Sequence, residues 1–124
     1  MTTTTETHTT AGTQINAVGA LMSLFSAHAG LPAARITSER VVTAERDPSG
    51  ALVCAWGLAL GFHSVTALAD FEQWRHALGI DPAAVEHETT GTFAWLIVTT
   101  THAGTPLTLV GYYTLAQAAA SDER

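Results

Sequence analysis

The chain has 124 residues, of which 47% are hydrophobic and only 13% are charged, so it has the length of one domain and too much apolar content for a disordered protein. Its formal net charge is −6, and its five basic residues are all arginine. Because nucleic acids and acidic membrane surfaces are bound through clusters of basic residues, this balance argues against either as a partner. The composition, rich in Ala and Thr and free of Lys, is typical of a GC-rich bacterial genome.

The first segment is a polar, Thr-rich run over residues 1–12, which predicts a disordered tail. A helix is predicted to follow, with Thr13 as its N-cap and with Gly30 and Pro32 ending it. Apolar residues at spacings of three and four predict its buried stripe: Ile15, Val18, Met22, Phe25 and Ala29, widened by Leu21 and Leu24.

This helix is uncharged, because no Asp, Glu, Lys or Arg occurs between Glu6 and Arg35. The triplet at residues 27–29 has the pattern of a signal-peptide cleavage site, but a secretory signal also needs a positive N-terminal region, which is missing here. Polar residues interrupt the apolar run, so no membrane span is predicted. We expect a helix that is buried or lies in an interface, with Leu21 and Phe25 as interface candidates.

Two strands are predicted next, over residues 34–47 and 51–65, joined by a turn at the sequence DPSG. The second strand has one bulky face and one small face, and the small face carries Gly57 and Gly61. Glycines inside a strand often mark the close approach of another backbone or of a ligand. These two glycines are therefore further interface candidates.

A second helix is predicted over residues 67–78, with Thr66 as its N-cap and Gly79 at its end. The spacing of its apolar residues predicts a buried stripe made of Leu68, Phe71, Trp74 and Leu78. The polar residues between them are expected to face water: Glu72, Gln73, Arg75 and His76.

Three further strands are predicted over residues 85–90, 92–101 and 106–114. The element order α-β-β-α-β-β-β, with short turns, predicts a two-layer α+β domain: a mainly antiparallel sheet of about five strands with two helices. The domain is expected to span residues 13–118, followed by a polar tail over residues 119–124.

The predicted sheet has apolar residues on both faces, which leaves two arrangements open. If both helices cover one face, the other face needs a partner, and a second copy of the chain is the expected one. If the helices cover opposite faces, a monomer suffices. We expect the first arrangement.

Sequence motifs for catalysis, metal binding and cofactor binding are missing from the chain. Ligand-binding candidates come from residue type and position instead. His63 continues the small face of its strand and could act as an acid or base with a carboxylate such as Asp70, while Trp56 and Trp95 could line a cavity. Glu72 and His76 lie one helical turn apart, which suits an ordinary surface pair better than a metal site.

Two functions are compatible with these features. The first, which we favour, is a small non-enzymatic binding or regulatory module that works through protein–protein contacts as a homodimer and has no cofactor. Its partners are itself and, as a further option, another protein. The second is a small α+β enzyme or ligand carrier with an aromatic-lined cavity and an acid–base histidine. The lone Cys54 allows no internal disulfide and makes the cytoplasm the default location.

The phrase HAGLP at residues 28–32 recurs as HAGTP at residues 102–106. We interpret both as sequences that end or turn a secondary-structure element rather than as a repeated metal-binding motif. In the first, Gly30 is expected to end a helix in a left-handed conformation. In the second, Ala103 and Gly104 are expected to turn one strand into the next.

Overall fold

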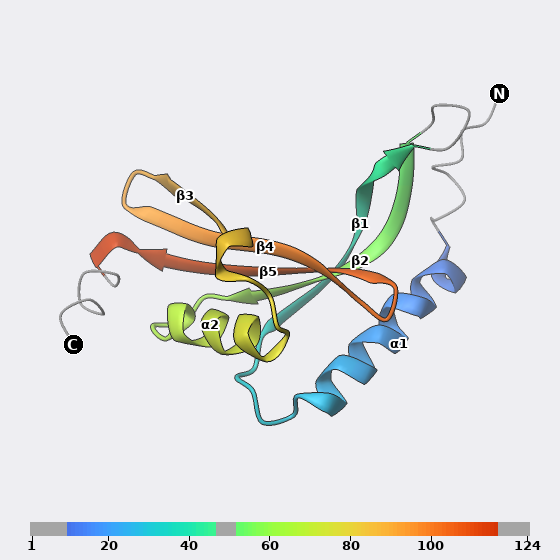
Figure 1. The fold of residues 1–124 in the computed structure, drawn as a ribbon, viewed down its shortest axis with the longest axis horizontal. Coiled ribbons are helices and arrows are strands. Elements are labelled where there is room, and N and C mark those ends of the chain that lie inside the picture. The colour runs from blue at the N-terminus through green and yellow to red at the C-terminus, as the bar shows by residue number, and fades with distance from the viewer. Residues whose placement is uncertain (1–9, 47–51, 117–124) are drawn as a thin grey trace.

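The computed structural model describes residues 10–46 and 52–116, with side chains undescribed between residues 42 and 54. The described elements follow the predicted order of an α+β fold (Figure 1). They are α1 (Ala11–Ala27), β1 (Arg35–Arg46), β2 (Leu52–Phe62), α2 (Ala67–Ala77), the short 3₁₀ helix η2 (Pro82–Ala84), β3 (Glu86–Thr90), β4 (Phe93–His102) and β5 (Thr105–Thr114).

The five strands form one mixed sheet in the order β1-β2-β5-β4-β3. Three of its pairings are antiparallel, as the short turns predict, but β2 and β5 run parallel, with Leu58 opposite Leu107. The parallel pair arises because α2 returns the chain to the end of the sheet where β2 began, so β3 runs in the same direction as β2. The β3–β4–β5 meander then brings β5 back alongside β2 with that same direction.

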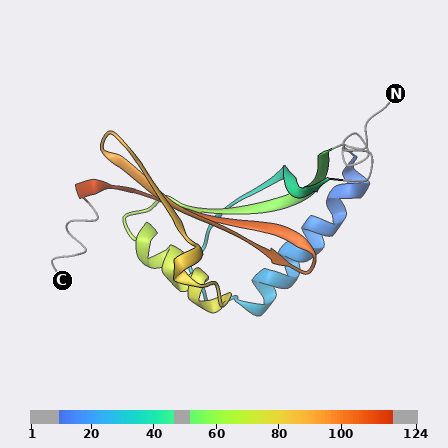
Figure 2. The ribbon, with the colours of Figure 1, turned by 45° about the horizontal axis from the view of Figure 1, so that its top comes forward.

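Both helices pack against the same face of the sheet, as Figure 2 shows most clearly. The core lies between them and that face, and it takes side chains from α1, α2, β2, β4 and β5. Its largest fully buried side chains are Trp74, Phe71, Leu24, Leu60, Leu107 and Leu109. The opposite face of the sheet has no helix over it in the described part of the chain.

Helix α1 turns a different side to the sheet from the one predicted. Ala17 and Leu24 are buried, whereas Ile15 and Met22 are each 66% exposed. The helix is apolar almost all round, so its pattern does not select one side. The sheet receives the side with small residues because alanines let the helix backbone approach closely. The predicted interface residues Leu21 and Phe25 are half-buried and pack on the core.

The start and end of α1 also differ from the prediction. Thr10, not Thr13, is the N-cap, and its side chain accepts a hydrogen bond from the Thr13 backbone N–H. The helix ends at Ala27 with His28 as C-cap, and Gly30 is not among the glycines with positive φ. The helix therefore ends without the left-handed glycine that its sequence suggests.

Helix α2 confirms most of its predicted features but buries one residue expected to face water. Gly79 ends it with a φ of +70°. Arg75 is only 8% exposed, because its guanidinium donates to the carbonyl of Ile80 and its Nε donates to the Glu72 carboxylate at 2.9 Å. These hydrogen bonds satisfy a cation that would otherwise be costly to bury.

The second of the two similar pentapeptides forms the predicted tight turn between β4 and β5. Ala103 and Gly104 have φ values of +50° and +79°, as expected for the two central residues of a type I′ turn. In the first pentapeptide, Pro32 has a different role, since its carbonyl accepts a hydrogen bond from the Trp74 indole at 2.8 Å. The two pentapeptides thus have different structural roles.

Some sequence predictions lie outside the described residues. These are the N-terminal tail up to residue 9, the DPSG turn at residues 47–50 and the C-terminal tail over residues 119–124. The last two residues of the predicted N-terminal tail, Ala11 and Gly12, belong to α1. Neither described helix combines the length and apolar character needed to cross a membrane.

Candidate functional site

The candidate site is the sheet surface that faces away from α1 and α2, which we call the open face. Strand alternation assigns the following side chains to it: Arg35, Thr37, Glu39 and Val41 from β1, Pro106, Thr108, Val110 and Tyr112 from β5, Phe93, Trp95 and Ile97 from β4, Glu86, Glu88 and Thr90 from β3. Strand β2 contributes Ala55, Gly57, Ala59 and Gly61, and His63 lies just beyond its end.

One row of cross-strand neighbours crosses the whole open face. It runs from Arg35 through Gly61, Val110 and Ile97 to Glu86. The row therefore begins with a cation on one edge strand, ends with an anion on the other, and has only small or apolar residues between them.

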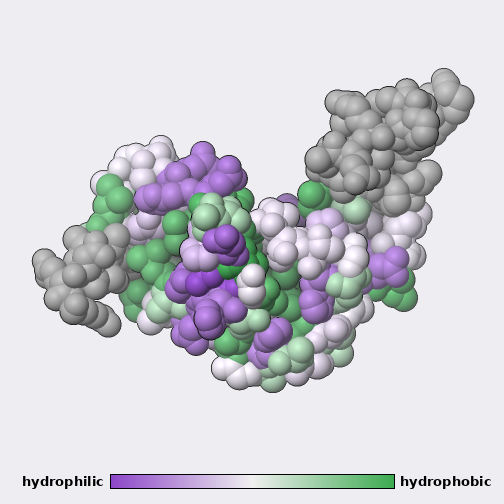
Figure 3. Space-filling model, viewed as in Figure 1, coloured by the Kyte–Doolittle hydropathy of each residue, from purple (hydrophilic) through white to green (hydrophobic). Residues whose placement is uncertain are grey.

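A second row lies two residues further along the strands and begins beside the end of β2 rather than on the edge strand. His63 stacks on Tyr112, which is paired with Trp95, and Trp95 is paired with Glu88. Within these two rows, Arg35 and His63 lie at the β1–β2 side of the open face and the carboxylates at the β3 side, whereas Glu39 of β1 lies outside both rows. Figure 3 shows the hydrophilic residues of β3 as a distinct patch beside apolar surface.

The glycines of β2 create space on the open face. A Cβ atom at Gly61 would lie 3.0 Å from Nε2 of His63 and 3.8 Å from Cβ of Arg35. The imidazole therefore occupies space that any larger residue at position 61 would fill. At Gly57, a Cβ atom would lie 2.8 Å from Cγ2 of Val41 and 3.0 Å from the carbonyl oxygen of Pro106, so that glycine allows close packing within the chain.

Two shallow depressions adjoin each other on this surface. The first has a volume of about 160 Å³ and is lined by Arg35, Thr37, Ala59, Gly61, His63, Val110 and Tyr112. The second has about 210 Å³ and shares His63 and Tyr112 with it. Both are smaller than the roughly 300 Å³ at which small-molecule pockets usually begin. Their size suits one or two side chains of a protein partner.

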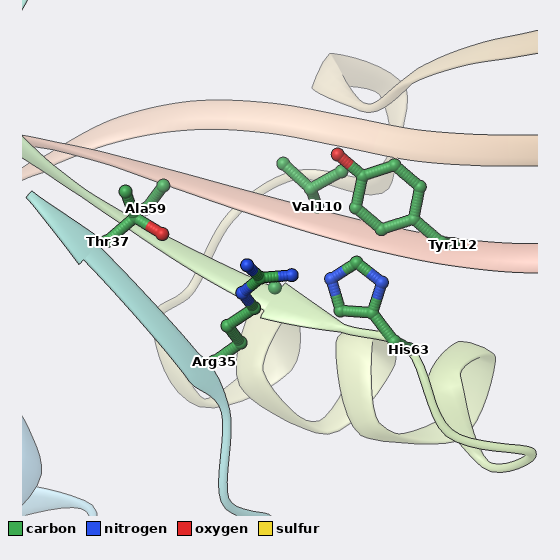
Figure 4. A pocket seen from close by; sticks show the side chains of 7 residues that line it. Arg35, Thr37, Ala59, His63, Val110 and Tyr112 are labelled. Atoms are coloured by element: carbon green, nitrogen blue, oxygen red, sulfur yellow. The ribbon is translucent and has the colours of Figure 1, made fainter. Parts of the chain in front are cut away.

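The polar groups of the first depression are suited to an anion. Figure 4 shows the guanidinium of Arg35 and the imidazole of His63 directed toward each other, with the Tyr112 ring beside the imidazole. A guanidinium, an imidazole N–H and hydroxyl groups all donate hydrogen bonds to carboxylates. Among the described residues, no ion pair involves Arg35, Glu86 or Glu88. The ion pair that is present there joins Glu72 to Arg75.

The residues predicted from sequence as ligand contacts do not form one site. His63 and Trp95 lie on the open face. Trp56 lies on the helix-covered side, where its indole N–H donates to the Thr13 hydroxyl at 3.1 Å. Asp70 accepts a hydrogen bond from the Thr66 hydroxyl at 2.9 Å, and none joins it to His63 among the residues described.

Sequence reasoning missed Arg35, Tyr112 and the two glutamates of β3 as members of one surface. The sequence shows how side chains alternate along each strand. It does not show that these residues share one surface, because that depends on the parallel pairing of β2 with β5. His87, between those glutamates, points to the opposite face, and its imidazole is hydrogen-bonded to the Tyr113 hydroxyl. Burial raises the pKa of Tyr113 above its ordinary value.

No group of three or more His, Cys, Asp or Glu side chains in the described part of the chain is arranged to hold a metal ion. Comparison of the chain with protein-family models, with curated proteins and with solved structures finds no match.

Proposed function

We propose that this chain is a non-enzymatic protein-interaction module that acts as a homodimer in the cytoplasm, and that the open face is its binding surface. The observation that supports this function is the placement of both helices on one side of the sheet. Large apolar residues on the other side remain without cover from the described chain. Phe93, for example, is 59% exposed. Exposed apolar patches often mark an interaction site.

The open face supplies most of the area that such a role needs. Strands lie about 4.8 Å apart and rise about 3.3 Å per residue, so five strands with central strands of 10 residues present about 600 Å² on one face. A stable interface buries roughly 800 Å² per partner. Contacts from the ends of the sheet would supply the remainder.

The enzyme or ligand-carrier hypothesis has weaker support. The depressions beside His63 are shallow and small, and the carboxylate proposed to assist it, Asp70, is hydrogen-bonded to Thr66 instead. A general base needs a partner that orients it and a pocket that holds the substrate beside it. The stacked Tyr112 ring orients His63, but it supplies no charge.

Sedimentation equilibrium on the full chain tests the proposal. We expect a dimer at micromolar concentration. Val110→Asp would place a charge at the centre of the open face and should weaken association at least 100-fold, because an unpaired charge would be buried. Ala69→Asp, which adds the same charge at an exposed position of α2, should leave the dimer intact. A wild-type chain that stays monomeric at several hundred micromolar would contradict the homodimer.

A further inference from the structure

Two neighbouring rows of side chains on the open face run from a basic residue to a carboxylate. Arg35 and His63 lie at the β1–β2 side of this face, and Glu86 and Glu88 lie at its β3 side. Glu39, also on β1, belongs to a different row, opposite Gly57 and two rows away from Arg35. The charged ends of the two rows are separated by β5, the central strand of the sheet.

This distribution distinguishes the ways in which two open faces can meet. A two-fold axis that lies between the sheets and runs across the strands would place Arg35 of one copy near Arg35 of the other. An axis that runs along the strands, over β5, would exchange the two edges of the sheet. Arg35 of each copy would then face Glu86 of the other, and His63 would lie over Trp95, one strand away from Glu88, while Val110 would lie close to its own counterpart.

We infer that the open face binds a second copy of the chain about a two-fold axis parallel to the strands, with the carboxylates of β3 from each copy received by Arg35 and His63 of the other. This inference rests on the proposed function and specifies its interface. The packing is sheet on sheet, with strands aligned within about 30° and faces about 10 Å apart. It is isologous, as a symmetric dimer requires.

The depression beside Gly61 is the structural element that receives the carboxylate. Its floor is made of Ala59, Gly61 and Val110, and its donors are Arg35 and His63. Because Gly61 lacks a side chain, the imidazole of His63 has room to lie low over the sheet, where an incoming glutamate can reach it. A guanidinium binds a carboxylate through two parallel hydrogen bonds, which gives the contact a defined direction.

Charge reversal provides the test, with the dissociation constant measured by sedimentation equilibrium. Arg35→Glu and Glu86→Arg should each weaken the homodimer at least tenfold, since each creates two like-charged contacts. An equimolar mixture of the two variants should form a heterodimer of near wild-type affinity, because both contacts then regain opposite charges. This rescue also shows that both variants are folded, and circular dichroism gives a second check.

Arg40→Glu is the matched control, because Arg40 lies on the same strand but on its other face, opposite Trp56. It makes the same charge change and should leave the dissociation constant within about threefold of wild type. If Arg35→Glu and Glu86→Arg behave like this control, or if the mixture shows no rescue, the inferred interface is wrong.

A second variant separates failure of this inference from failure of the homodimer itself. The exposed stripe of α1, formed by Ile15, Val18 and Met22, is the competing apolar surface. A dimer that is broken by Met22→Asp and unaffected by the charge reversals would preserve the homodimer but overturn the open-face geometry. A wild-type chain without any dimer would overturn both.

Discussion

The imidazole of His63 stacks on the phenol ring of Tyr112, with the ring centroids 4.4 Å apart and the ring planes 14° from parallel. The contact joins the end of β2 to β5 on the open face. It depends on the missing side chain of Gly61, since a Cβ atom there would lie 3.0 Å from the imidazole. The position of a basic group on this surface is thus controlled by a glycine two residues away.

Gly61→Ala should therefore displace His63 with little effect on stability. The neighbour of the added methyl group is the end of a rotatable side chain, so we expect a loss of less than about 1 kcal/mol in the free energy of unfolding. Proton NMR should show the His63 ring signals moving as the ring current of Tyr112 is lost, with His63→Gln used to assign them. Unchanged signals would show that the imidazole does not occupy this space.

Gly57→Ala should have the opposite effect. Its methyl group would lie 2.8 Å from a Val41 methyl and 3.0 Å from the backbone oxygen of Pro106, and a backbone oxygen inside a sheet cannot rotate away. We expect a loss of about 1 to 3 kcal/mol, as for other overpacked sites. Urea denaturation of Gly57→Ala and Gly61→Ala compares the same substitution at two positions on the same face of β2. Equal losses for the two glycines would contradict this interpretation.

Trp74→Phe should destabilise the fold more than either glycine substitution. The indole is 1% exposed, contacts the Phe25 and Phe62 rings, and donates to the Pro32 carbonyl at 2.8 Å. The variant loses packed volume and leaves that carbonyl without its hydrogen-bond partner. We therefore expect the free energy of unfolding to fall by about 2 to 4 kcal/mol in total. Urea denaturation measures the loss, and Trp95→Phe on the open face serves as the control with a smaller expected effect.

Much of the fold can be predicted from the sequence because its signals are local. Positive φ values occur at Gly79, Gly91 and Gly104, where glycine is the residue that the backbone favours. The alternation of apolar residues then indicates the strands that lie between these glycines. The orientation of α1 could not be predicted, since apolar residues lie on several sides of this helix and its few scattered polar residues give little preference. The burial of Arg75 depends on the Ile80 carbonyl, which the helical pattern does not reveal.

The candidate site was harder to predict than the fold. Gly61 and His63 stand out in the sequence because a small strand face is unusual. Arg35 and Glu86 do not, because they lie far apart along the chain and share a row only through four successive strand pairings. One of those pairings, between β2 and β5, is long-range and parallel, and no short turn signals it.

The stability of the chain should depend on pH through Glu72. Its hydrogen bond from Arg75 is the main cause of a pKa below the ordinary glutamate value. A lowered pKa in the folded state means that the ionised carboxylate stabilises the fold above the unfolded-state pKa, about 4.3. That stabilisation is lost as the pH falls through the lower, folded-state pKa.

Glu72→Gln should accordingly lower the free energy of unfolding at pH 7 by no more than about 1 kcal/mol, because the Glu72 side chain is 57% exposed. The difference from wild type should shrink below about pH 4. Thermal unfolding at pH 7 and at pH 3 tests both statements. A difference that grows as the pH falls would show that the carboxylate does not act through this ion pair.

The β4–β5 turn offers a stabilising substitution. Ala103 has a φ of +50°, which costs a residue with a Cβ atom some free energy, whereas asparagine tolerates it. Ala103→Asn creates the Asn-Gly pair preferred in type I′ turns and should raise stability by about 0.5 to 1 kcal/mol. Gly104→Ala should lower stability by a similar amount or more. Melting temperatures of the two variants should therefore move in opposite directions.

The parallel pairing of β2 with β5 has a consequence for how the chain folds. The β1–β2 hairpin and the β3–β4–β5 meander can each pair their strands through nearby residues, whereas β2 and β5 meet only after a long loop has closed around α2 and two strands. Closing that loop carries the entropic cost that slows proteins of high contact order. Because β5 is synthesised after every other strand of the sheet, a growing chain exposes an incomplete sheet until its central strand is made.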